Sequence, residues 1–72
     1  MSQAADNMEL TVNGELFDGD VTTLADLIGE LGYGEQRVAT AVNGDFIPDS
    51  DRKDYALRDG DHVEVVAPRQ GG

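Results

Sequence analysis

Two glycines end the printed chain, Gly71 and Gly72, and they closely follow an apolar run at 63–67 that has the composition of a strand. Without Cβ atoms, two successive glycines form a thin segment that can enter a narrow slot and carry a carboxylate to a reagent held there. A carboxylate is a poor electrophile until it is activated, so we expect another enzyme to act on it. Residues 68–72, with Arg69 and Gln70, are predicted to be a flexible tail.

The composition bounds the size and class of the protein. Its 72 residues suffice for one small domain, near the lower limit at which a single hydrophobic core holds a fold. There is no cysteine, so the chain can form no disulfide or thiolate metal site and cannot carry sulfur on a thiol of its own. One histidine and two serines leave little from which to build a nucleophile with its base. We therefore predict a protein that is not an enzyme and binds no cofactor.

The charge of the chain excludes some partners. Fifteen acidic against five basic residues give a net charge of -10, which repels phosphate backbones and anionic membrane surfaces. Nucleic acid and membranes are not expected partners, whereas a basic docking surface would attract the chain. Residues 1–7 lack the basic start and apolar core of a secretion signal, and no apolar run is long enough to cross a bilayer. We expect a cytoplasmic monomer.

A leader, a hairpin and a helix are predicted in the first half of the chain. Residues 1–7 are small and polar without periodicity, which predicts a disordered leader. Apolar and polar residues alternate over 8–12, and Asn13-Gly14 is a strong hairpin signal before a second strand at 15–18. A helix is predicted to begin at the capping sequence that starts with Thr23 and to end at Gly32. Its apolar stripe at i, i+3, i+4 and i+7 consists of Leu24, Leu27, Ile28 and Leu31.

The second half repeats the hairpin signal. A β-branched run at 38–42 precedes Asn43-Gly44 and a short strand at 45–47, which Pro48 should end. The polar stretch 49–53 is predicted to be a loop. Residues 55–57 can place one or two apolar side chains on the core, and a turn at 59–61 leads into a last, edge-like strand at 62–66. The resulting class is α+β, a mixed sheet of four to five strands packed on one helix.

Alternation along the strands suggests a second surface. If Thr40, Val42, Ile47, Val63 and Val65 face the helix, their neighbours turn to the opposite side of the sheet. An exposed Phe46 and Val66 beside the tail, with Ala41 between them, would then form a docking patch. The alternative is a scattered apolar surface with no function.

Three segments carry a resemblance to a known family. They are VNGDFIP at 42–48, LRDGDHVEVV at 57–66 and the terminal Gly71-Gly72. Together, in this order and spacing, they resemble the ThiS/MoaD group of ubiquitin-like β-grasp sulfur carriers. The likeness covers residues 8–72, and it implies a β-grasp domain over 8–67 followed by the tail.

The resemblance implies a function for the last residue. In such carriers the terminal glycine, here Gly72, is adenylated with ATP by a ubiquitin-activating-type adenylyltransferase and converted to a thiocarboxylate. The sulfur then passes to a synthase, and the Ile47-Pro48 pair looks more like the thiamine-pathway carriers, whose acceptor is a thiazole synthase. Two alternatives stay open. One is a MoaD-type carrier for molybdopterin synthesis. The other is a protein modifier joined through Gly72 to lysines of target proteins, because the acidic surface resembles that of the archaeal small modifier proteins.

Other readings of particular residues are less favoured. Aspartates at 49, 51 and 54 hint at a calcium loop, but the glycine and glutamate that such a loop requires are missing, so we expect no metal site. His62 has no second histidine or cysteine nearby and is expected to be a surface imidazole rather than a ligand or a base. A stand-alone inhibitor or interaction module would fit the same composition without needing a free terminal carboxylate.

Overall fold

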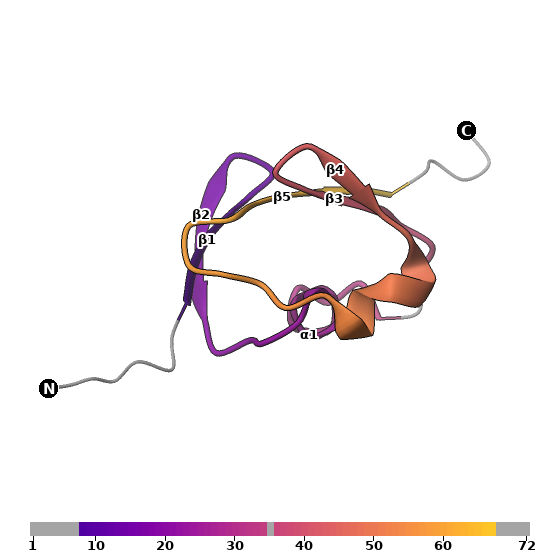
Figure 1. The fold of residues 1–72 in the computed structure, drawn as a ribbon, viewed down its shortest axis with the longest axis horizontal. Coiled ribbons are helices and arrows are strands. Elements are labelled where there is room, and N and C mark those ends of the chain that lie inside the picture. The colour runs from indigo at the N-terminus through magenta and orange to yellow at the C-terminus, as the bar shows by residue number, and fades with distance from the viewer. Residues whose placement is uncertain (1–7, 35, 68–72) are drawn as a thin grey trace, which may run out of the picture.

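The computed structural model describes residues 8–34 and 36–67, which fold into a five-stranded mixed sheet with helices on one side (Figure 1). The predicted leader at 1–7 and tail at 68–72 lie outside the described residues. In chain order the elements are β1 (Met8–Val12), β2 (Glu15–Gly19), α1 (Leu24–Glu30), β3 (Ala39–Val42), β4 (Asp45–Ile47), the 3-10 helix η1 (Asp49–Asp54) and β5 (His62–Val66).

Both hairpins close on an Asn-Gly turn, as the sequence predicts. Asn13 and Asn43 each have a φ of 53°, in the left-handed region that asparagine tolerates better than most residues. The glycines that follow also have positive φ, which two-residue turns of this kind require. The turns fix the register, so that Val12 lies opposite Glu15 and Val42 lies opposite Asp45.

The last strand lies in the middle of the sheet. The strand order is β2-β1-β5-β3-β4, with β5 parallel to β1 and antiparallel to β3 (Figure 1). The prediction of an edge-like final strand was therefore wrong. Alternation shows which face of a strand is buried, but it does not show which neighbours pair with it across a long connection. The free edges are β2 and β4 instead.

The helix α1 begins at a capping box. The Thr23 hydroxyl accepts from the Asp26 N–H at 3.2 Å, and the Asp26 carboxylate accepts from the N–H groups of Thr23 at 3.0 Å and Thr22 at 3.2 Å. These backbone hydrogen bonds, first from Thr23 and then from Thr22, hold the pKa of Asp26 below its ordinary value. The helix ends at Glu30, and Gly32 follows with a φ of 89°, which confirms it as the terminator.

The core lies between α1 and the sheet. It contains most of the residues predicted to be buried, but Leu31 is only partly buried, and the loop residue Val21 is an addition that was not predicted. Tyr55 is half-buried beside Leu57, so the stretch 55–57 does place side chains on the core as expected. The buried apolar residues are Leu10, Val12, Val21, Leu24, Leu27, Ile28, Val42, Ile47, Leu57, Val63 and Val65.

The stretch predicted to be a loop after Pro48 is a 3-10 helix, η1. Pro48 ends β4 and precedes this helix in an extended conformation, which proline favours before a helical turn. Among the residues of η1, Arg52 is buried, which local polarity does not predict. A buried arginine requires acceptors, and the sheet supplies them, so η1 is held by a tertiary contact that the sequence pattern does not reveal.

Candidate functional site

The sheet face turned away from α1 carries the predicted patch of Ala41, Phe46 and Val66, hereafter the outer patch. The register places Ala41 opposite both Phe46 on β4 and Glu64 on β5, and it places Ala39 opposite Val66. Phe46 is 67% exposed and Val66 is 62% exposed, while Ala41 is half-buried between its neighbours. The predicted exposure is confirmed, and the role of the patch in docking stays a prediction.

Leu16 is a third exposed large apolar side chain, which the sequence pattern did not single out. It lies opposite Thr11, and Thr11 lies opposite His62, so Leu16 shares the outer face of the sheet at its other edge. Its exposed fraction is 73%. Leu16 and Phe17 are adjacent apolar residues, so alternation alone cannot tell which of them faces out, and only the register decides it.

The predicted tail residues Arg69, Gln70, Gly71 and Gly72 lie outside the described residues. The structure does describe the strand that leads to them. β5 ends at Val66, in the centre of the sheet, and it is bonded to β1 near its start and to β3 along its length. The outer patch therefore includes the last residue of the strand that precedes the tail.

Both turn asparagines hold β5 with their side chains. Asn13 Oδ1 accepts from the N–H of Val65 at 2.8 Å, and Asn13 Nδ2 donates to the carbonyl of Val65 at 3.1 Å. Asn43 Oδ1 accepts from the N–H of His62 at 3.0 Å, and Asn43 Nδ2 donates to Asp61 Oδ1 at 3.0 Å. The sequence identifies both residues as turn formers, but their side-chain partners are about 20 to 50 residues away and could not be predicted from spacing.

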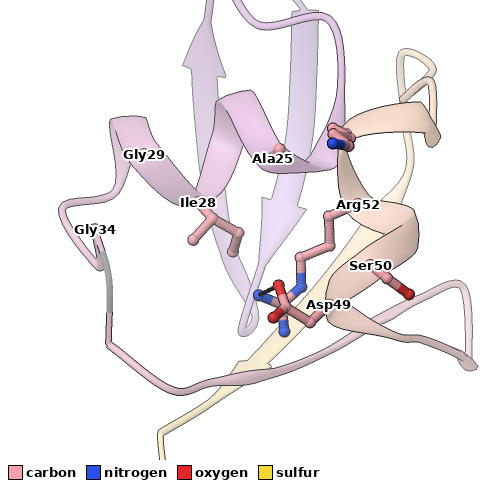
Figure 2. Close-up of a pocket in the computed structure, with 8 residues that line it drawn as sticks. Ala25, Ile28, Gly29, Gly34, Asp49, Ser50 and Arg52 are labelled. Atoms are coloured by element: carbon pink, nitrogen blue, oxygen red, sulfur yellow. Dashed lines mark hydrogen bonds and ion pairs between the residues drawn. The ribbon is translucent and has the colours of Figure 1, made fainter.

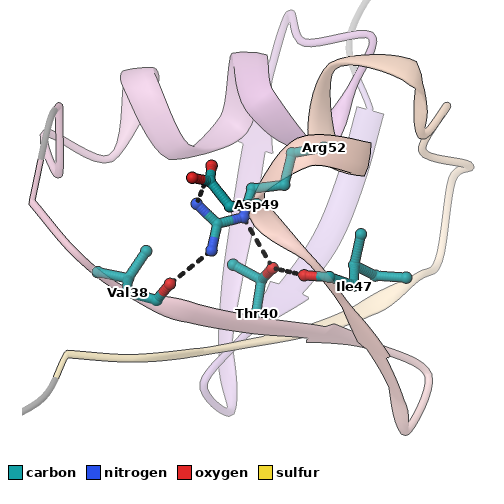
Figure 3. Close-up of polar contacts among 5 residues, drawn as sticks. All are labelled: Val38, Thr40, Ile47, Asp49 and Arg52. Atoms are coloured by element: carbon teal, nitrogen blue, oxygen red, sulfur yellow. Dashed lines mark hydrogen bonds and ion pairs between the residues drawn. The ribbon is translucent and has the colours of Figure 1, made fainter.

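Arg52 links η1 to the sheet (Figure 3). Its Nε donates to the Thr40 hydroxyl at 3.0 Å, its Nη2 donates to the Val38 carbonyl, and its Nη1 lies 3.4 Å from Asp49 Oδ1. The Asp49 side chain is 93% exposed, so its ion pair with Arg52 is largely screened by solvent. Two neutral oxygens of the sheet side and one exposed carboxylate thus satisfy the buried guanidinium, which is the arrangement of a structural anchor.

A cavity of about 460 Å³ separates α1 from η1 (Figure 2). Ile28 and Gly29 line it from the helix, and Asp49 and Arg52 line it from η1. Figure 2 shows the Arg52 guanidinium and the Asp49 carboxylate turned toward each other, while the Ser50 hydroxyl points away from both. The Arg52 and Asp49 side chains are thus bonded to the protein and to each other rather than directed at one point in the cavity.

Within 8–34 and 36–67, no three His, Asp or Glu side chains are arranged to hold a metal ion. The three aspartates considered and rejected as a calcium loop lie on the 3-10 helix η1. His62 is exposed at the start of β5. In the same described residues, no helix is both long and apolar enough to cross a membrane.

The fold and the outer face together define a class of protein. An α+β domain in which a mixed five-stranded sheet packs one face on a helix, with a central last strand, is a β-grasp domain of the ubiquitin-like type. Residues 5–72 match the ThiS family, and the chain belongs to that family. The resemblance noted from the sequence is thereby confirmed.

Individual relatives agree with this assignment. The sulfur carrier protein ThiS of Thermus thermophilus is 39% identical over 61 residues, which cover 85% of this chain and 95% of that protein. The crystal structure of the thiamine biosynthesis protein ThiS from Geobacter metallireducens is 28% identical, with a TM-score of 0.75 over 90% of this chain and 100% of that one.

A larger protein also contains a similar segment. A thiazole synthase of Paramagnetospirillum magneticum is 40% identical over 67 residues, which cover 90% of this chain. The chain spans only 20% of the length of that thiazole synthase. The likeness is therefore to one part of that polypeptide.

Proposed function

We propose that this protein is a sulfur carrier of thiamine biosynthesis that acts through the carboxylate of Gly72 and is not itself an enzyme. The observation that carries the proposal is the match to the ThiS family, because it extends through residue 72 and so includes the Gly-Gly end. A relative of nearly the same length is named a sulfur carrier protein, which supports the same reading.

The chemistry has two steps, both involving the carboxyl group of Gly72. The Gly72 carboxylate attacks the α-phosphorus of ATP on an adenylyltransferase, which forms an acyl adenylate and releases pyrophosphate. A sulfide equivalent then attacks the activated carbonyl and expels AMP, which leaves a thiocarboxylate. The chain supplies a thin terminus and no catalytic group, and ATP is consumed by the partner enzyme. We place the reaction in the cytoplasm because it consumes ATP.

Two partners are implied by this chemistry. The first is the adenylyltransferase, which we propose docks on the outer patch, since exposed aromatic residues are the usual anchors of interfaces. The second is a thiazole synthase that accepts the sulfur, and a thiazole synthase containing a segment similar to this chain supports that choice. The molybdopterin and protein-modifier alternatives use the same carboxylate, but one relative is named a thiazole synthase and a similar solved structure is named a thiamine biosynthesis protein.

Intact mass spectrometry tests the proposal. After incubation with ATP, a sulfide source and an adenylyltransferase that acts on ThiS-family carriers, the chain should gain the mass difference between oxygen and sulfur. Deletion of Gly72 should abolish both this gain and ATP–pyrophosphate exchange, and Gly71→Val should cripple both by adding bulk and restricting φ and ψ. Melting temperatures should match the parent, because neither change touches the core. Exchange supported by the truncated chain would remove Gly72 from the reaction.

A further inference from the structure

We propose that Asn13 is a positioning residue that sets the direction in which β5 leads into the tail. The inference rests on the proposed function, because it concerns how the terminal glycine is delivered. It starts from the place where β1 stops pairing with β5. The two strands pair through Thr11 with His62 and through Val12 with Val63, and the chain then turns away at Asn13.

The Asn13 side chain continues the ladder that the turn interrupts. The Asn13 N–H still donates to the Val63 carbonyl at 2.9 Å, as the next parallel bond should. From there the backbone leaves the sheet, and the side-chain amide offers one acceptor and one donor to the backbone of Val65. These are the two groups that a continuing β1 would have offered, so the amide replaces a missing piece of strand.

The position of Val65 gives this contact its importance. Val65 is the second-last residue of β5, and its other side is paired with Thr40 on β3. Val66, the last residue of the strand, lies opposite Ala39, the first residue of β3. Without Asn13, the end of β5 would be held from the β3 side alone, and its direction would be less well fixed.

Asn43 provides a matched control within the same molecule. It occupies the same kind of Asn-Gly turn with the same φ, and its side chain also makes two hydrogen bonds, one to β5 at His62 and one to Asp61 just before it. However, His62 is the first residue of β5, so both partners lie at the opposite end of the strand from Val66. Asn13→Gly and Asn43→Gly each keep the left-handed turn, which glycine adopts freely, and each remove a side-chain clamp.

The experiment compares these two variants in full-length chain with the adenylyltransferase. With Asn13→Gly, the kcat of ATP–pyrophosphate exchange should fall at least about fivefold, the factor to which the net free energy of one hydrogen bond corresponds. The KM for the carrier should change less, because the outer patch is intact. With Asn43→Gly, kcat should stay at the parental value. Asn13→Asp keeps the acceptor for the Val65 N–H and should give an intermediate kcat.

Hydrogen exchange of the isolated chain gives an independent readout. Asn13→Gly should lose protection at the Val65 N–H while the α1 amides keep theirs, which separates a local change from unfolding. An equal loss of kcat in both glycine variants would reduce Asn13 to a general stabiliser and overturn the inference. If the parent is active and Asn13→Gly has the same kcat, the inference about Asn13 is overturned while the proposed function stands. An inactive parent would overturn the proposed function and this inference with it.

Discussion

The Nε of Arg52 donates to the hydroxyl of Thr40 at 3.0 Å, and the same hydroxyl donates to the carbonyl of Ile47 at 2.8 Å (Figure 3). Arg52 is only 9% exposed, so this chain of donors ties η1 to β3 and β4 away from water. Because a threonine hydroxyl has one hydrogen and two lone pairs, it can serve both partners at once. The short polar helix is held in place by this contact.

Replacing Arg52 by methionine should therefore destabilise the fold even though the volume is nearly kept. The change removes a donor from the buried Thr40 hydroxyl, which keeps its bond to Ile47, and from the part-buried Val38 carbonyl, at about 1–3 kcal/mol in all. Asp49→Asn is the control, because the exposed Asp49 side chain should contribute less than about 1 kcal/mol. Urea denaturation measures both. Equal midpoints for the two variants would show that Arg52 is not an anchor.

The core assignment predicts a contrast between two leucines. Leu27 is 0% exposed under the sheet, and Leu27→Ala should cost about 2–5 kcal/mol, enough to threaten a domain this small. Leu16→Ala makes the same chemical change at an exposed position and should shift stability by less than about 0.5 kcal/mol. Guanidinium denaturation of the two variants is the measurement. A midpoint unmoved by Leu27→Ala would contradict the core.

The capping box predicts that the contribution of Asp26 to the free energy of unfolding depends on pH. Its folded-state pKa lies below the unfolded value because the backbone N–H of Thr23, and then that of Thr22, bonds to the carboxylate. The stabilisation is therefore present above the unfolded pKa of about 4 and is lost as the pH falls through the lower, folded pKa. The stability difference between the parent and Asp26→Asn should be largest near neutral pH and shrink toward pH 2. If the stability difference did not depend on pH, the charge of the Asp26 carboxylate would not contribute to the helix cap.

The outer patch predicts an effect on binding without an effect on stability. Phe46→Ala should weaken binding to the adenylyltransferase by about fivefold or more, since truncating an aromatic anchor of an interface commonly costs more than about 1 kcal/mol. Its melting temperature should stay near the parent, because the ring is 67% exposed in the free chain. Titration calorimetry tests this, with Leu16→Ala as a comparison on the far side of the same face. Unchanged affinity would remove Phe46 from the interface.

Local signals in the sequence predicted the parts of the fold that depend on local physics. The Asn-Gly turns, the capping box at Thr23 and the alternation that exposes Phe46 all involve residues close in sequence, and all are confirmed. The central position of β5 and the burial of Arg52 were not predicted, because each depends on partners brought together only by the whole fold. The same holds for Asn13, whose sequence role as a turn former gives no sign of its contact with Val65.

The Asn-Gly turns are also sites where asparagine can lose its side-chain amide by deamidation, and the fold affects how fast this happens. In such a pair the glycine nitrogen can attack the asparagine amide carbon, expel ammonia and, after hydrolysis, leave an aspartate or an isoaspartate. At Asn13 the folded chain restrains this reaction, because both ends of the side-chain amide are bonded to Val65. Loss of ammonia leaves a cyclic imide, and its hydrolysis to aspartate puts a carboxylate in place of the amide, with one oxygen facing the Val65 carbonyl. Each excursion to the unfolded state thus exposes the chain to irreversible ageing at the clamp on β5.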